Sequence, residues 1–202
     1  MARIIYIHGM GGGSDSRIPS ILRDHLPAEV ELDVRTYDFD PEKATEKIRD
    51  WVEDYKPDLV VGESLGALHA LKLPNVKRIL VSPALGAASW LRFFGILSFI
   101  PGITPLLDRI YRPRPGDRQS LHFTWKTLKK YKRHYSEAVS DNGGSVFAFF
   151  GKKDHYLKWK IVNIKKYRKL YGDDYIIYDG SHFMEEEFVI SMLLPKIIEK
   201  IM

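Results

Sequence analysis

Cysteine is absent from the 202 residues of this chain. Its absence excludes disulfide bonds, thiolate zinc sites and a cysteine nucleophile. The amino terminus also lacks a signal peptide, because its apolar run is short and no small-residue cleavage site follows it. This second absence predicts a cytoplasmic protein.

The chain has only a modest excess of one charge, with 31 Lys and Arg side chains against 26 Asp and Glu and a formal net charge of +5. The basic residues concentrate in residues 126–133 and 158–169. Such patches either attract phosphates and anionic lipid headgroups or solvate exposed helices. Since neither a Gly-rich phosphate loop nor a nucleic-acid motif accompanies them, we prefer the solvated helices and expect no nucleic-acid partner.

Strand-like and helix-like patterns alternate along most of the chain. This alternation predicts an α/β fold, with a mainly parallel sheet of about six strands and helices on both faces. We expect a single domain spanning residues 1–202. Strands are predicted at residues 3–7, 31–39, 59–62, 76–82, 145–151 and 175–179, and helices up to residue 26 and at 41–55, 65–72, 156–171 and 185–201.

Residues 84–142 interrupt the alternation and contain no clear strand, which predicts an inserted cap or lid. Residues 90–110 are strongly apolar, but Arg92, Pro101, Pro105 and Asp108 interrupt them. A membrane span needs about 20 mainly apolar residues, so we expect no stable membrane insertion. The apolar stretch either lines a substrate pocket or docks on a membrane or partner, and we prefer the pocket.

The segment Gly62-Glu63-Ser64-Leu65-Gly66 is the main chemical motif. A serine hydroxyl is a poor nucleophile, so a hydrolase must expose it beside a general base and donors for an oxyanion. Glycines two positions before and after the serine permit a sharp turn between a strand and a helix. An apolar strand is predicted before this turn and a helix after it, so Ser64 is the predicted nucleophile.

These residues resemble the α/β-hydrolase superfamily, in particular its small cytoplasmic serine esterases, over nearly the whole chain. The run His8-Gly9-Met10-Gly11-Gly12, after the first strand, resembles the HGxG-type loop of that family. The resemblance implies an oxyanion hole formed by the backbone amides of Met10 and Leu65. It also implies that His8 supports the loop and does not transfer protons.

The chain order of the same family, serine, then acid, then histidine, implies the other two catalytic residues. His182 follows the last predicted strand and is the expected general base. Asp154 follows the preceding strand and is the expected acid that orients this histidine. Asp179 is a rival for the acid, although it lies only three residues before His182.

The expected function is therefore hydrolysis of a small to medium, apolar acyl ester through a Ser-His-Asp triad and an acyl-enzyme. Alternatives are a thioesterase or peptidase with the same triad, or a non-catalytic protein of this fold that binds an anionic or lipid partner. No cofactor is expected. No metal is expected either, because His25, His122 and His134 share no metal-ligand spacing with any carboxylate. The sequence predicts no particular oligomeric state.

Overall fold

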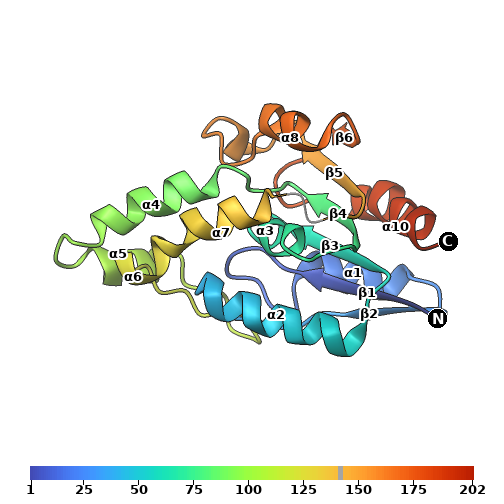
Figure 1. Cartoon of the computed structure of the whole chain (residues 1–202), viewed down its shortest axis with the longest axis horizontal. Coiled ribbons are helices and arrows are strands. Elements are labelled where there is room, and N and C mark those ends of the chain that lie inside the picture. The colour runs from blue at the N-terminus through green and yellow to red at the C-terminus, as the bar shows by residue number, and fades with distance from the viewer. Residues whose placement is uncertain (141–142) are drawn as a thin grey trace.

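Six parallel strands form the centre of the computed structural model, which describes residues 1–140 and 143–202 (Figure 1). Their order in the sheet is β2-β1-β3-β4-β5-β6. The predicted α/β fold with a mainly parallel sheet is confirmed. The strands are β1 (Ala2–Ile7), β2 (Val30–Asp33), β3 (Leu59–Glu63), β4 (Lys77–Val81), β5 (Val146–Gly151) and β6 (Tyr175–Tyr178).

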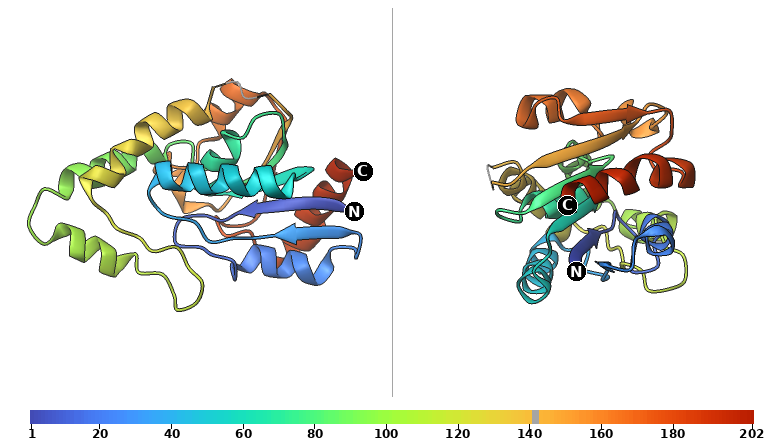
Figure 2. Two further views of the ribbon diagram at one scale, coloured as in Figure 1. Left: turned by 60° about the horizontal axis from the view of Figure 1, so that its bottom comes forward. Right: turned by 90° about the vertical axis from the view of Figure 1, so that its right-hand side faces the viewer.

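Successive side chains of each strand point to opposite faces of the sheet, and both faces are covered. In β1, Ile5 and Ile7 join one buried cluster, whereas Ile4 and Tyr6 join the other. The first cluster includes residues of α2 (Pro41–Tyr55), α3 (Gly66–Leu71) and α8 (Ile164–Tyr171). The second includes residues of α1 (Arg17–His25) and α10 (Leu194–Ile201) (Figure 2). Burial on two faces explains why the central strands are continuous apolar runs.

The order of the strands defines where a ligand can bind. The chain runs from β1 to β2 on one side and then returns to place β3 on the other side of β1. Loops leaving the carboxyl ends of β1 and β3 diverge at this switch point, which opens a crevice in sheets of this kind. The predicted loop at Met10 and the predicted turn at Ser64 both lie at this edge.

Residues 84–140, here called the α4–α7 segment, project beyond the sheet (Figure 1). They contain the helices α4 (Ala87–Leu97), α5 (Ile103–Ile110), α6 (Trp125–Leu128) and α7 (Lys130–Ala138). The division into one domain with a cap at about 84–142 stays a prediction, and residues 141 and 142 lie outside the described residues. Across the described chain, no helix is both long enough and apolar enough to span a membrane.

The α4–α7 segment is fastened to the rest of the protein at both ends. Near its start, the indole Nε1 of Trp90 donates a hydrogen bond to the carbonyl of Trp159 at 2.9 Å. Near its end, the hydroxyl of Tyr131 donates to the carbonyl of Phe39 at 2.7 Å. The ammonium of Lys130 pairs with Asp40, the residue that caps α2, at 2.7 Å.

The second strand is shorter than predicted. It pairs with β1 from Val30 to Asp33 and then leaves the ladder, although the sequence pattern continues to residue 39. Beyond Asp33, side chains contact loops instead of a strand. Thr36 accepts a hydrogen bond from the amide of Ser14, and the Tyr37 hydroxyl donates one to the carbonyl of His8. These contacts take the chain over the carboxyl end of β1.

Two predicted helices are interrupted. The helix expected at 156–171 is a short 3-10 turn, η1 (His155–Leu157), followed by α8, because Lys160 takes a left-handed conformation with φ of 56°. Asn163 then caps α8 by accepting a hydrogen bond from the amide of Lys166. The helix expected at 185–201 consists of α9 (Glu186–Phe188), the π-helix η2 (Val189–Leu193) and α10.

Candidate active site

Ser64 occupies the sharp turn between β3 and α3. Its φ is 51°, a left-handed conformation that is costly for a residue with a side chain. The turn is fixed by backbone hydrogen bonds to the neighbouring strand end: the Ser64 amide donates to the carbonyl of Val81 at 2.8 Å, and the Ser64 carbonyl accepts from Ala84 at 3.0 Å. The serine side chain is therefore held at the carboxyl edge of the sheet and is partly exposed.

The two glycines of the motif are required by close packing around the turn. A Cβ on Gly62 would lie 2.8 Å from atoms of Ala67 and Ala70 in the following helix. A Cβ on Gly66 would lie 2.3 Å from the carbonyl oxygens of Ile7 and His8. Both distances are shorter than any tolerable contact, so α3 can approach β1 and β3 only without these side chains.

His182 lies within hydrogen-bonding distance of Ser64. Its Nε2 is 2.9 Å from the serine Oγ, across 118 residues of sequence. The imidazole is buried, and the Tyr156 ring packs edge-on against it with 4.6 Å between centroids. The loop after β6 thus presents His182 to a serine that follows β3.

Asp154 completes this chain of polar contacts. Its Oδ2 lies 2.7 Å from Nδ1 of His182, and its Oδ1 accepts a hydrogen bond from the amide of Tyr156 at 2.8 Å. Both side chains of the His182–Asp154 pair are almost completely buried. A carboxylate at Nδ1 favours the tautomer in which Nε2 is free to accept a proton.

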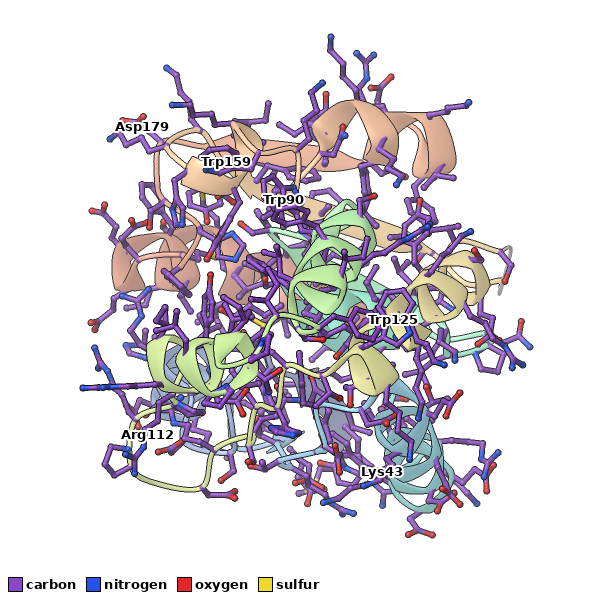
Figure 3. The ribbon with its side chains drawn as sticks, turned by 90° about the vertical axis from the view of Figure 1, so that its left-hand side faces the viewer. Lys43, Trp90, Arg112, Trp125, Trp159 and Asp179 are labelled. Atoms are coloured by element: carbon purple, nitrogen blue, oxygen red, sulfur yellow. The ribbon has the colours of Figure 1, made fainter. Side chains whose placement is uncertain are left out.

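Asp179, the rival acid, points elsewhere. Its carboxylate pairs with the ammonium of Lys153 at 3.0 Å on the protein surface, and Figure 3 shows it at the edge of the molecule. The hydrogen bond from Lys153 lowers the pKa of Asp179 below its ordinary value. The geometry therefore brings Asp154, and not Asp179, to His182.

The loop after β1 lies directly against the serine turn. A Cβ on Gly9 would approach the Cβ of Ser64 to 3.1 Å. The backbone amides of Met10 and Leu65 flank this contact, and within the described ranges neither donates a hydrogen bond to another protein group. Both residues line the same cleft as Ser64 and His182.

The buried side chain of His8 packs against the inner side of this loop. Its ring is fully buried and stacks on Tyr37 with centroids 4.3 Å apart, and its Nδ1 donates to the carbonyl of Gly9 at 2.8 Å. Burial lowers the pKa of His8 to about 4, so the ring is neutral at physiological pH. This buried position is compatible with the supporting role that the family resemblance implied, which stays a prediction.

A cleft of about 940 Å³ opens over Ser64. One wall is aromatic and includes Trp90 and Trp159, which lie side by side at the top of Figure 3 with ring centroids 5.5 Å apart. Phe94 and Phe123 of the α4–α7 segment extend this apolar lining. The apolar stretch that the sequence singled out thus contributes to the cleft.

Four arginines also line the cleft, and the sequence analysis did not single them out: Arg17, Arg112, Arg114 and Arg118. Arg17 donates to the carbonyl of Met184, and Arg118 pairs with Asp15 at 2.7 Å. For Arg112 and Arg114, no ion pair is formed within the described part of the chain. Exposed arginines in a loop carry no periodic signal, so sequence reasoning had no means of placing them here.

A second group of buried histidines lies behind the site. His69 of α3 and His134 of α7 have ring centroids 4.4 Å apart, and burial lowers the pKa of both. Among the described residues, no group of three or more His, Cys, Asp or Glu side chains is placed to hold a metal ion.

The fold and this site define an α/β protein whose carboxyl-edge loops join a serine, a histidine and an aspartate beneath a cleft. The model of the alpha/beta hydrolase family matches residues 4–187, and the chain therefore belongs to that family. No curated protein matches the sequence.

Solved structures of low identity share the fold. A monoacylglycerol lipase from Paleococcus ferrophilus is 16% identical, with a TM-score of 0.62 over 98% of this chain and 92% of the lipase. Est1E from Butyrivibrio proteoclasticus with bound ferulic acid is 17% identical, with a TM-score of 0.65 over 100% and 90%. The thioesterase domain from the curacin biosynthetic pathway is 16% identical, with a TM-score of 0.57 over 98% and 90%.

Proposed function

We propose that the protein is a serine hydrolase in which Ser64, His182 and Asp154 form the catalytic triad, and that it cleaves esters of small to medium, apolar acyl groups. The observation that carries this proposal is the continuous contact from the Ser64 Oγ through the His182 imidazole to the Asp154 carboxylate. Membership of the alpha/beta hydrolase family supports it.

The reaction proceeds in two steps. His182 Nε2 takes the proton of Ser64 as the serine oxygen attacks the ester carbonyl, and Asp154 stabilises the imidazolium that forms. The imidazolium then protonates the departing alcohol, which leaves an acyl-enzyme. In the second step the neutral imidazole takes a proton from water, the hydroxide oxygen attacks the acyl carbonyl, and the proton returns to Ser64 as the acid departs. These steps use no cofactor.

The oxyanion of each tetrahedral intermediate is assigned to the amides of Met10 and Leu65. Two lines of geometry support this assignment: the Met10 loop touches the serine turn, and Leu65 directly precedes α3, whose first amides point toward its amino end. Donors fixed in place before the reaction stabilise charge without reorganisation.

The lining of the cleft supports an apolar acyl group. The wall formed by Trp90, Phe94 and Phe123 offers aromatic surface next to the nucleophile. A cleft of about 940 Å³ accommodates a molecule of the size that small-molecule sites usually bind. A cytoplasmic location and a single domain with a cap remain part of this proposal.

Labelling with a fluorophosphonate probe tests the nucleophile. The wild-type protein is expected to react covalently, and Ser64→Ala to lose both labelling and at least about 10⁵-fold in ester turnover. Ser136→Ala, which removes an exposed serine of α7, is the matched control and should keep both. A wild-type protein that fails to react would instead favour the non-catalytic alternative.

The kind of bond is tested with a substrate panel. Aryl esters, acyl thioesters and aminoacyl amides with the same acyl group are compared by kcat/KM. Esters are expected to be cleaved fastest. A preference for thioesters or amides would assign the same triad to a thioesterase or a peptidase.

A further inference from the structure

The far end of the α4–α7 segment exposes an unusual amount of apolar surface. Six large side chains there are between 49% and 68% exposed. We call them the apolar tip: Phe93, Ile96, Phe99, Ile100, Leu106 and Ile110. Scattered apolar side chains are normal on a protein surface, whereas a contiguous patch marks a binding surface.

The residues of the apolar tip lie on two consecutive helices and the turn that joins them into a hairpin. Phe93 and Ile96 lie on α4, Leu106 and Ile110 lie on α5, and the turn between these helices carries Phe99 and Ile100. Trp125 at the start of α6 extends the patch, since its ring lies 5.6 Å from that of Phe99. Figure 1 shows this hairpin farthest from the sheet, and Figure 3 views it from that end.

The segment that carries the apolar tip is basic. Residues 84–140 hold ten Lys and Arg side chains and three Asp and Glu, whereas the whole chain holds 31 and 26. The rest of the chain, with 21 basic and 23 acidic side chains, is therefore slightly acidic. Arg92, Arg109 and Lys126 adjoin tip residues or Trp125 in sequence, and within the described residues none of the three forms an ion pair.

This charge distribution favours an anionic lipid surface over a second copy of the chain as the partner. A second copy docked tip to tip would bring two strongly basic segments together, and the like charges would oppose that contact. An anionic lipid surface satisfies both features, because its headgroups attract the basic side chains while its acyl boundary takes up the apolar ones.

We propose that the apolar tip docks the protein peripherally on a bilayer containing anionic lipids. Phe99 and Ile100 enter the boundary between headgroups and acyl chains, and Arg92, Arg109 and Lys126 remain at the level of the phosphates. The hairpin lies in the interface and does not cross it, in keeping with the absence of a spanning helix among the described residues.

Docking in this way brings the cleft close to the membrane. Along α4, Trp90 and Phe94 line the cleft, while Phe93 and Ile96 belong to the apolar tip. One helix therefore serves as a cleft wall and as part of the docking surface. An amphiphilic ester would then reach Ser64 from the bilayer past the aromatic side chains of α4.

Vesicle flotation tests the docking independently of catalysis. The wild-type chain is expected to float with phosphatidylglycerol vesicles and at least about tenfold less with phosphatidylcholine vesicles, because each cation contributes about fivefold at an anionic surface. The double variant Phe99→Ser, Ile100→Ser should lose at least about tenfold in partitioning to phosphatidylglycerol. Arg92→Gln with Arg109→Gln should lose a similar factor there and little on phosphatidylcholine.

The matched control is Leu170→Ser, which removes an exposed apolar side chain from the basic helix α8, away from the tip. It should partition like the wild type, and equal thermal midpoints establish that all variants are folded. The proposal is overturned by absent flotation, by equal binding to both lipids, or by a tip variant that binds like the wild type. It is also overturned if the wild type sediments as a dimer that the tip variant dissociates and no vesicle binding is seen.

Discussion

The carboxyl edge of the sheet and the α4–α7 segment are built in opposite ways. At the sheet edge, His182 and Asp154 are buried, and the imidazole lies 2.9 Å from the Ser64 Oγ and 2.7 Å from the Asp154 carboxylate. At the apolar tip, six large side chains are between 49% and 68% exposed. The first region fixes atoms for chemistry, whereas the second leaves surface available for contact. Substitutions in the two regions should therefore differ in the property that they affect and in the size of the effect.

Among changes that keep Ser64, the largest effect is expected where the sheet edge orients the histidine. Asp154→Asn should lower kcat by about 10⁴-fold, because an amide at Nδ1 stabilises the wrong tautomer of His182. Asp179→Asn removes a carboxylate from the adjacent strand end and should cost less than about twofold, since Asp179 pairs with Lys153 at the surface. Steady-state kinetics on an aryl ester measure both, and the reverse ranking would transfer the role to Asp179.

Replacing one glycine in each region with alanine should lower the free energy of unfolding by different amounts. Gly66→Ala should reduce the free energy of unfolding by about 3 kcal/mol or more, because its Cβ would meet two carbonyl oxygens at 2.3 Å. Gly102→Ala at the apolar tip meets nothing within 4 Å and should cost about 1 kcal/mol, from its φ of 85° alone. Urea unfolding followed by circular dichroism measures both. Equal losses would mean that the tip is as tightly packed as the serine turn.

A smaller effect on stability is expected from the contact between α3 and α7, where two buried histidines lie together. His69 of α3 and His134 of α7 are buried, and burial lowers the pKa of His134 from 6.5 to about 3. As the pH falls below 6.5, the unfolded chain binds these protons and the folded chain does not, so stability present at neutral pH is lost on acidification. Each histidine should contribute about 1–2 kcal/mol of this loss between pH 7 and 5.

Urea unfolding at the two pH values measures this loss. His134→Phe should reduce the loss of stability between pH 7 and 5 by the contribution of one histidine. His25→Gln, which changes an exposed histidine of α1, should leave that loss unchanged. A pH dependence that survives His134→Phe intact would show that the contact between the two regions does not depend on a neutral imidazole.

The sequence predicted the sheet edge well because its signals are local. Each strand is a short apolar run, and the glycines at 62 and 66 indicate a turn that no other residue pair permits. The chain order of the resembling family then led to His182 and Asp154, which lie in contact beside Ser64 and whose catalytic roles stay a prediction. The predicted strand at 31–39 failed at its end because Thr36 and Tyr37 bond to loops that are distant in sequence.

The α4–α7 segment was predicted only as an apolar stretch. Hydrophobicity does not tell which side of a helix faces a cleft, so Phe94 in the cleft and Phe93 at the surface looked alike. The interruption at Lys160 was also missed, because a lysine in a left-handed conformation has no sequence signal. Its neighbour Trp159 is held by the side chain of Trp90, a contact across 69 residues.

The backbone of Ser64 places stability and activity in conflict at one residue. Glycine adopts a φ of 51° without the penalty of about 1 kcal/mol or more that any side chain incurs there. A selection for heat resistance alone would therefore accept glycine at position 64 and discard the proposed nucleophile. Efforts to stabilise this protein must accordingly be scored on turnover as well as on folding.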